Sequence, residues 1–311
     1  MTNRRNFEFT SSDSLLVEAT TDPDDEILKR FFEEYDRAFV LPDERETFKG
    51  FQDCLALNSS QVGERLSRRY GPHSEVVGNV YDVTHRDAIG GFNLICYPIA
   101  TNVGSTETNF LCGNLNYVFV NLPYRRRGYL RKIISAICEC MDQLFNLKRK
   151  PSVSHLIFVE LNHPFRLTAE EYVKDTEHGG IDQLERIRIW ARLKFEIVDF
   201  PYAQPALSYA QAPDAALLYS VLAIEQFGSL SPKLLRKHLE RFFAISVLKG
   251  AESHDDPTVA SQLKLLDDMA ASGESIRLLD PIKWLATASP TDVITGIIED
   301  PTQITLRKTI P

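Results

Sequence analysis

The chain lacks the features that mark membrane and secreted proteins. None of its hydrophobic runs approaches the roughly 18–20 residues that a membrane-spanning helix needs. The N-terminal stretch carries Arg4 and Arg5 but not the apolar segment that would follow them in a secretory signal. These absences predict no membrane partner, and we expect a cytoplasmic location.

Cysteine is scarce, and the count of five is odd. Cys54, Cys96 and Cys112 lie in apolar stretches, whereas Cys138 and Cys140 lie in a segment with helical spacing. Residues two apart point in different directions on a helix, so the last two cysteines do not make half of a zinc site. The sequence predicts reduced, mostly buried thiols and no bound metal.

An excess of positive charge is also missing. The net charge is −8 over 311 residues, of which 43% are hydrophobic and 25% charged, an ordinary globular composition. A basic face is the usual footprint of a nucleic-acid-binding protein, so this balance argues against a nucleic acid partner. One basic cluster, between Arg125 and Lys132, stands out against the acidic background. A compact polyphosphate explains a cluster of this size better than a duplex does.

Residues 114–141 contain this cluster and read as a strand, a turn and a helix. Apolar side chains alternate along residues 115–119 as on a strand, and Pro123 ends it because proline cannot donate a ladder hydrogen bond. Beyond Gly128 the apolar spacing becomes helical. A helix start leaves backbone N–H groups unpaired at the positive end of the helix dipole. With basic side chains around it, this corner predicts a phosphate site.

The hexamer at residues 125–130, Arg-Arg-Arg-Gly-Tyr-Leu, resembles the acyl-CoA signature of the GNAT superfamily of N-acyltransferases, Gln/Arg-x-x-Gly-x-Gly/Ala. Arg125 and Gly128 match it, whereas Leu130 stands where the family has glycine or alanine. The order of expected elements over about residues 14–225 also resembles the GNAT order, with a strand and helices before three antiparallel strands, the basic turn and its helix. The resemblance implies an α/β fold with a mixed sheet and acetyl-CoA as co-substrate.

The resemblance also implies where acyl-CoA binds. The turn would hold its diphosphate, the preceding strand would pair with its pantetheine arm, and an amide near Phe119 or Val120 would stabilise the oxyanion. Asn162, at the end of a later strand, has two open roles, a bond to a pantetheine amide or a turn bond to its own backbone. The residues expected at this site are Val118, Phe119, Val120, Arg125, Arg126, Arg127, Gly128, Tyr129, Leu130, Arg131 and Asn162.

Glu160 is the expected catalytic base. It lies near the end of residues 153–161, a nearly continuous apolar run that predicts a central strand covered on both faces. The resemblance implies that two strands separate at this level and that thioester and amine meet in the gap. A partly desolvated carboxylate there would have a raised pKa suited to a base. A structural partner for Glu160, such as an arginine near the surface, is the competing interpretation.

Tyr202 is the expected general acid. The segment from Trp190 to Phe195 is similar to the family's Tyr-x-x-x-Gly-Phe, in which the tyrosine often protonates the departing thiolate. Trp190 occupies the tyrosine position, and an indole cannot serve as an acid. Tyr202, in a loop stiffened by two prolines, is preferred over Tyr172 and Tyr129.

Two domains are expected, a GNAT-like catalytic domain over residues 1–225 and a mainly helical C-terminal extension over residues 226–311. The extension has three open roles: covering the acceptor site, forming a homodimer or stabilising the first domain. Four local predictions go with this division. They are a loose segment at residues 1–13, a polar loop at 101–109, a helix at 276–286 and a terminal hairpin formed by 293–298 and 304–310.

The favoured function is an acyl-CoA-dependent N-acyltransferase, most simply an N-acetyltransferase in which the acceptor amine attacks the thioester directly. Small amines, amino acids, peptide termini and lysine side chains are all open as acceptors, and a larger acyl group is open too. A second hypothesis belongs to another class. The fold would then be a non-catalytic module that binds CoA or a protein partner, which the departures at Trp190 and Leu130 favour.

Overall fold

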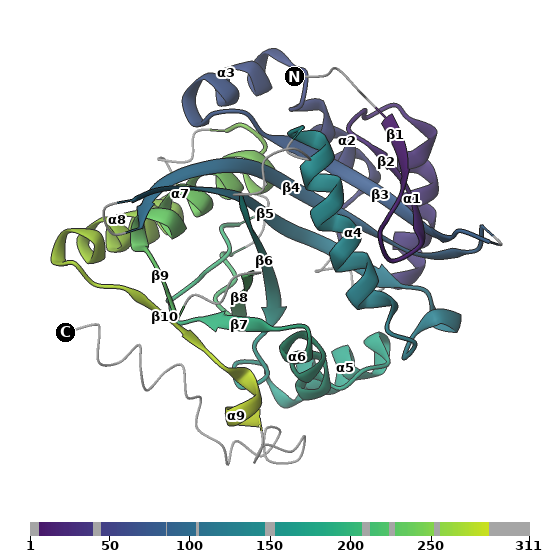
Figure 1. The fold of residues 1–311 in the computed structure, drawn as a ribbon. Helices are drawn as coiled ribbons and strands as arrows, with labels where there is room; N and C mark the ends of the chain where they lie inside the picture. Colours follow the sequence, from purple (N-terminus) through teal and green to yellow (C-terminus); the bar gives the residue numbers. More distant parts are fainter. Residues whose placement is uncertain are drawn as a thin grey trace. The chain divides into compact units, whose positions relative to one another are not determined.

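The protein has a mixed α/β fold, as predicted (Figure 1). The structure is a computed structural model that describes residues 6–39, 45–84, 86–103, 106–146, 153–206, 212–223, 228–251 and 256–285. The chain forms two compact units. Unit 1 consists of Met1–His155 with Ala244–Gly250, and unit 2 consists of Leu156–Phe243 with Ala251–Pro311. The division into a catalytic domain that ends at residue 225 and an extension that begins at residue 226 stays a prediction.

Unit 1 contains an antiparallel sheet in which five strands, β1 to β5, pair in chain order. Its elements are β1 (Asn6–Thr10), β2 (Leu15–Thr20), α1 (Glu26–Ala38), α2 (Phe48–Ala56), α3 (Gln61–Tyr70), β3 (Ser74–Asp82), β4 (Ala88–Val103), β5 (Thr106–Val120), the short 3₁₀ helix η2 (Leu122–Tyr124) and α4 (Tyr129–Leu144).

Different helices cover the two faces of this sheet. Cys96 and Glu75 belong to adjacent cross-strand pairs of β3 and β4, so their side chains point to opposite faces. A Cβ at Gly113, the cross-strand partner of Cys96, would lie 3.3 Å from Cε of Met141 on α4. Val77, on the same face as Glu75, belongs to the apolar cluster of α1 and α2. Helix α1 shares its apolar cluster with α2. Helix α4 therefore packs on one face, and α1 and α2 pack on the other (Figure 1).

Strand β5 carries one extra residue at its centre. Residues 93 and 94 of β4 pair with Tyr117 and Leu115, so Asn116 between them forms a β-bulge. The bulge shifts the alternation of side chains by one residue. It turns Tyr117 toward the α1 face, where its ring lies 4.9 Å from that of Tyr35, centroid to centroid.

Unit 2 contains a second antiparallel arrangement, in the order β6-β8-β7-β10-β9. Its elements are β6 (Ser154–Asn162, which begins in unit 1), α5 (Ala169–Gly179), α6 (Gln183–Arg192), β7 (Phe195–Val198), β8 (Leu217–Ala223), β9 (Ser229–Leu230), α7 (Pro232–Phe242), α8 (Pro257–Ser272), β10 (Ile276–Leu279) and α9 (Pro281–Leu285). A π-helical turn, η3 (Phe243–Val247), leads from α7 back into unit 1.

Several local predictions were wrong. Part of the segment expected to be loose forms β1, because Phe7 and its neighbours pair with β2. The expected polar loop at residues 101–109 lies largely in a long hairpin, in which β4 reaches Val103 and β5 begins at Thr106. Residues 276–279 form β10, because Leu278 and Leu279 pair with β7, and a helix follows only at Pro281. The expected terminal hairpin lies outside the described residues.

Most of the cysteines are buried, as predicted. All five are free thiols in the structure, and four of them are buried. Burial raises the pKa values of the Cys54 and Cys96 thiols well above the usual range of a cysteine. In the described part of the chain, every helix is too short or too polar to cross a membrane.

Candidate functional site

The turn from β5 to α4 has the backbone that the phosphate prediction requires. Gly128 is the N-cap of α4 and takes a left-handed conformation, with φ 79°. A Cβ added to Gly128 would have no heavy atom of the described residues within 4 Å, so these residues leave the space beside this glycine open. Within the same part of the chain, no side chain caps the first turn of α4. Open space and uncapped N–H groups at a helix start suit a phosphate group.

Side chains hold this turn in place from the strand side. Asn121 donates its side-chain N–H to the carbonyl oxygen of Ala88 (2.9 Å) and to Glu34 Oε2 (3.1 Å). Arg125 donates its Nε–H to the carbonyl oxygen of Val120 (3.0 Å). At least part of the Arg125 guanidinium therefore ties the turn to the end of β5, a structural role that the sequence did not predict.

Positive charge gathers at the surface of the same corner. Arg126, Arg127 and Arg131 are exposed. The Arg127 guanidinium lies 6.0 Å from the centre of the Tyr124 ring, and the Lys132 ammonium lies 5.6 Å from that of Tyr129. Guanidinium groups pair well with phosphate oxygens. The corner therefore has the donors that a diphosphate needs, while Leu130, which is half-buried, keeps the departure from the family signature.

Residues 118–120 occupy the end of β5 that leads into this turn. They pair with Phe92, Gly91 and Gly90 of β4. A Cβ at Gly90 would clash with the carbonyl oxygen of Phe119, so glycine permits the close approach of the two strands here. The Phe119 ring belongs to the core on the α1 face, and Val118 and Val120 are half-buried.

In unit 2 the two predicted catalytic side chains contact each other. The Tyr202 hydroxyl donates a short hydrogen bond to Glu160 Oε1, and Gln204 donates its Nε2–H to the same oxygen at 3.0 Å. Glu160 is half-buried on β6, and Tyr202 is 2% exposed. A carboxylate that accepts two bonds on one oxygen keeps its second oxygen for another partner.

The surroundings of this pair shift both pKa values upward. Burial raises the pKa of Glu160 to about 7, Asp214 adds to the rise, and the bonds from Tyr202 and Gln204 oppose it. Burial and the nearby Glu160 raise the pKa of Tyr202 well above its usual value. Near neutral pH, Glu160 thus lies where a general base is most effective, while Tyr202 keeps its proton.

The remaining candidates from the sequence have structural partners. Asn162 pairs with Leu217 of β8 in the sheet of unit 2. Trp190 is 8% exposed and packs edge-to-face against Phe195, with ring centroids 4.7 Å apart. The Tyr172 hydroxyl donates to Asp182 Oδ2 at 2.6 Å. Among the three candidate tyrosines, only Tyr202 bonds to Glu160 in the described contacts.

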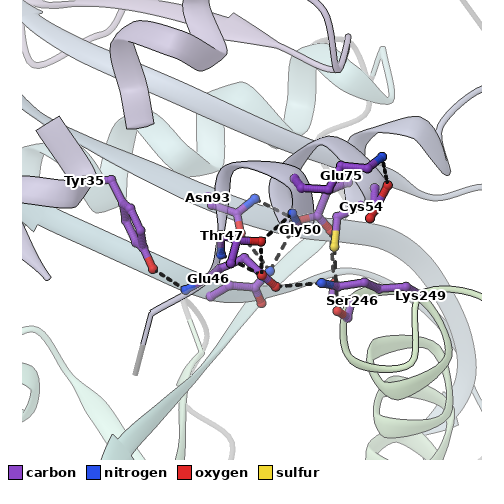
Figure 2. A network of polar contacts seen from close by, with 12 residues as sticks. Tyr35, Glu46, Thr47, Gly50, Cys54, Glu75, Asn93, Ser246 and Lys249 are labelled. Carbon is purple, nitrogen blue, oxygen red and sulfur yellow. Dashed lines mark hydrogen bonds and ion pairs between the residues drawn. The ribbon is translucent and has the colours of Figure 1, made fainter. Parts of the chain in front are cut away.

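Unit 1 holds a second buried carboxylate, Glu75, that the sequence did not reveal as a candidate. Glu75 is 1% exposed, and it accepts hydrogen bonds from Asn93 Nδ2 (2.7 Å), Asn116 Nδ2 (3.3 Å) and Ser246 Oγ (3.0 Å). Figure 2 shows it between Asn93 of the sheet and Ser246 of the segment that returns from unit 2. Burial raises the pKa of Glu75 to about 7. The signal in the sequence was a polar residue on each of two apolar strands, at positions 75 and 93.

An ion pair and a tyrosine extend this network toward α2 (Figure 2). Lys249 donates to Glu46 Oε2 at 2.8 Å, and the Glu46 backbone N–H donates to the Tyr35 hydroxyl at 2.7 Å. Burial raises the pKa of Tyr35 to about 12. Tyr35 is 0% exposed, so it serves the core of unit 1.

Among the described residues, no group of three or more His, Cys, Asp and Glu side chains is placed to hold a metal ion. No family model matches the chain, and no curated protein matches it.

Solved structures with a similar arrangement do exist. NAA60 of Arabidopsis thaliana in complex with acetyl-CoA is 15% identical, with 68% of this chain and 98% of that chain covered and a TM-score of 0.38. The ribosomal-protein-S18-alanine N-acetyltransferase of Escherichia coli is 13% identical, with 65% and 90% covered and a TM-score of 0.32. The ribosomal-protein-S5-alanine acetyltransferase of Vibrio fischeri is 13% identical, with 71% and 97% covered and a TM-score of 0.34.

The two enzymes that act on ribosomal proteins are acetyltransferases by name, and NAA60 is in complex with acetyl-CoA. At these identities and TM-scores the similarity gives no residue-by-residue correspondence, so the functional proposal rests on the side chains and backbone of this chain.

Proposed function

We propose that the chain is an acyl-CoA-dependent N-acyltransferase, most simply an N-acetyltransferase with acetyl-CoA as co-substrate. The turn between β5 and α4 carries this proposal. It combines a left-handed glycine beside open space, a helix start without a side-chain cap, and exposed Arg126 and Arg127. Backbone N–H groups at a helix start and guanidinium groups are the donors that bind diphosphates in proteins.

The acetyl thioester would supply the acyl group. The acceptor amine forms an amide bond with it, and CoA leaves as a thiol. Glu160 takes the proton that the amine loses, because its raised pKa matches neutral pH. Tyr202 gives its proton to the departing thiolate and regains one from Glu160 through the hydrogen bond that they share. This direct route needs no covalent intermediate and hence no cysteine nucleophile.

The acceptor is an amine, and small amines, peptide termini and lysine side chains all meet the chemical requirement. The acyl chain length, a homodimer, the absence of nucleic acid and membrane partners, and a cytoplasmic location stay predictions from the sequence. The alternative of a non-catalytic CoA-binding module has one structural observation in its favour. Trp190 packs in the core of unit 2 where the family has an acidic hydroxyl.

The CoA assignment is tested by reversing charge at the turn. Arg126→Glu with Arg127→Glu should weaken CoA binding by more than tenfold, about 1.4 kcal/mol, because the new carboxylates repel the diphosphate. Isothermal titration calorimetry with CoA measures this. The matched control is Arg68→Glu with Arg69→Glu on α3, an adjacent pair in the same unit that makes the same change in charge.

The CoA titration tests the phosphate site, and a thiol-release assay separates the transferase from the binding module. Equal CoA affinity in the two double variants would refute the phosphate site. Thiol release from acetyl-CoA in the presence of mixed amines supports the transferase, whereas CoA-dependent thermal stabilisation with no thiol release supports the binding module.

A further inference from the structure

Helix α8 contacts the loop that carries Tyr202. The amide side chain of Gln262, on α8, bonds both backbone groups of Ala203, the residue after Tyr202. Its Oε1 accepts the Ala203 N–H at 3.0 Å, and its Nε2 donates to the Ala203 carbonyl oxygen at 2.8 Å. Gln262 is 5% exposed, and its Nε2 also donates to the carbonyl oxygen of Thr258 at 3.1 Å. The loop is therefore fixed to α8 at one residue, through the two peptide units that flank Ala203.

A stack of rings supports the Tyr202 side chain. Its ring lies parallel to that of Tyr219, with centroids 4.3 Å apart and an interplanar angle of 11°. Tyr219 is also the cross-strand neighbour of Glu160. The Tyr219 hydroxyl shares a 2.6 Å hydrogen bond with Nε2 of His238 on α7, and His238 stacks on Phe158 at 3.8 Å. The ring of Tyr202 is thus held by a neighbour that α7 in turn holds.

We infer that Gln262 is a positioning residue for the acid–base pair, because it holds the Tyr202 loop at the place where the hydroxyl reaches Glu160, with the Tyr219–His238 pair as the support of the ring. This inference rests on the proposed function. It gives α7 and α8 a part in the chemistry, although neither helix touches the reacting groups. A misplaced hydroxyl loses much of its effect, because proton transfer demands hydrogen-bond distance.

A second buried glutamine in unit 2 shows that burial alone does not give this role. Gln183 on α6 is 0% exposed, and neither polar atom of its side chain has a hydrogen-bond partner among the residues that the structure describes. Both polar atoms of the Gln262 side chain, in contrast, bond to the backbone of Ala203, the residue after Tyr202. The two glutamines therefore form a matched pair for substitution.

The test is a double-mutant cycle read at the Glu160 carboxyl. Infrared or ¹³C NMR titration of the full chain follows that carboxyl, with Glu160→Gln assigning the signal. The groups that face Glu160 are Tyr202, Gln204, Asp214 and Tyr219. Tyr202→Phe removes a bond to the ionised form and should raise the Glu160 pKa by about one unit. The same shift is expected in the Gln183→Leu background.

In the Gln262→Leu background, the rise of the Glu160 pKa caused by Tyr202→Phe should be less than half of the rise in the native chain. The reason is that the loop no longer holds the hydroxyl on Glu160. Tyr219→Phe is the milder second background, because it removes one oxygen and keeps the ring. It should reduce the rise of the Glu160 pKa less than Gln262→Leu does. A full shift in the Gln262→Leu background would overturn the inference, as would no change of the Glu160 pKa on Tyr202→Phe in the otherwise native chain. The titration needs no turnover, so failure of the proposed transferase, seen as absent thiol release, is distinguishable from failure of this inference.

Discussion

Glu75 in unit 1 and Glu160 in unit 2 are two carboxyl groups with the same raised pKa and different surroundings. Burial raises the pKa of each to about 7. Glu75 is bonded by two amides and a serine hydroxyl, none of which titrates near neutral pH. Glu160 is bonded by the hydroxyl of Tyr202 and by one amide.

The difference lies in what each carboxyl can exchange. Glu75 is enclosed on all sides at 1% exposure, and its partners only orient it. Glu160 is half-buried and shares a hydrogen bond with a group that can give and take a proton. A raised pKa alone therefore does not identify a catalytic base, because burial produces it at a structural site as well. The hydrogen-bond partners and the access of solvent distinguish the two.

Glu160→Gln tests the comparison most strongly. If Glu160 is the base, this substitution should lower kcat for acetyl transfer by about 100-fold or more, because an amide cannot accept the proton. In the native chain, kcat/KM should rise with pH through about 7 as Glu160 ionises. Stopped-flow or continuous thiol-release assays measure both quantities.

Glu75→Gln is the matched control for that experiment. It is isosteric, it keeps an acceptor for Asn93 and a donor for Ser246, and kcat should stay within about threefold of the native value because Glu75 touches no reacting group. Equal losses in the two variants, or a larger loss in Glu75→Gln, would reverse the assignment of roles.

Stability against pH provides the second test. Below pH 4.5 the Glu75 carboxyl is protonated in both the folded and the unfolded chain. Between pH 4.5 and about 7 the unfolded chain releases a proton that the folded chain keeps, so the free energy of unfolding falls as pH rises. The loss reaches up to about 3 kcal/mol above pH 7. Glu75→Gln should abolish it.

Urea denaturation at pH 5 and pH 8 measures this effect. The difference in stability between Glu75→Gln and the native chain should shift in favour of the variant at pH 8. Glu160→Gln should show a smaller shift, because Glu160 is more exposed and water screens its charge. Parallel pH dependence in all three proteins would show that neither carboxyl is protonated in the folded state at pH 5 to 7.

Lys249→Met should have the smallest effect. Lys249 and Glu46 are 30% and 21% exposed, so loss of their 2.8 Å ion pair should cost about 0.5–1 kcal/mol. The Lys249 ammonium also favours the ionised form of Glu75, so the substitution should raise the Glu75 pKa slightly. The Glu160 titration should not move. A shift at Glu160 and none at Glu75 would contradict the separation of the two networks.

The turn between β5 and α4 was predictable because its determinants are local. Proline after β5, glycine before α4 and the helical spacing that follows all act within about one turn of the backbone. The start of α5 was predictable for the same reason, since Thr168 and Glu171 form the expected capping box. The raised pKa of Glu160 could also be predicted, because a charged residue at the end of an apolar strand is placed where burial removes water from it.

The long hairpin and β10 could not be predicted in the same way. Residues 101–109 are polar, and their strand conformation depends on pairing across β4 and β5. Residues 276–279 are apolar with no strong period, and pairing with β7 decides that they form a strand. Strand preference follows the packing of cross-strand neighbours more than the residue itself. Glu75 escaped prediction because an acid on an apolar strand usually marks its exposed face.

By itself, the sequence determined the strand, turn and helix that end in a basic corner, because proline, glycine and apolar spacing act over short stretches of backbone. Only the tertiary structure decided which acids are desolvated and what touches them. The Tyr202–Glu160 bond spans 42 positions in the chain, and the Ser246–Glu75 bond spans 171. Contacts of that range depend on the packing of whole elements, and the pKa of a carboxyl follows from the water that this packing excludes.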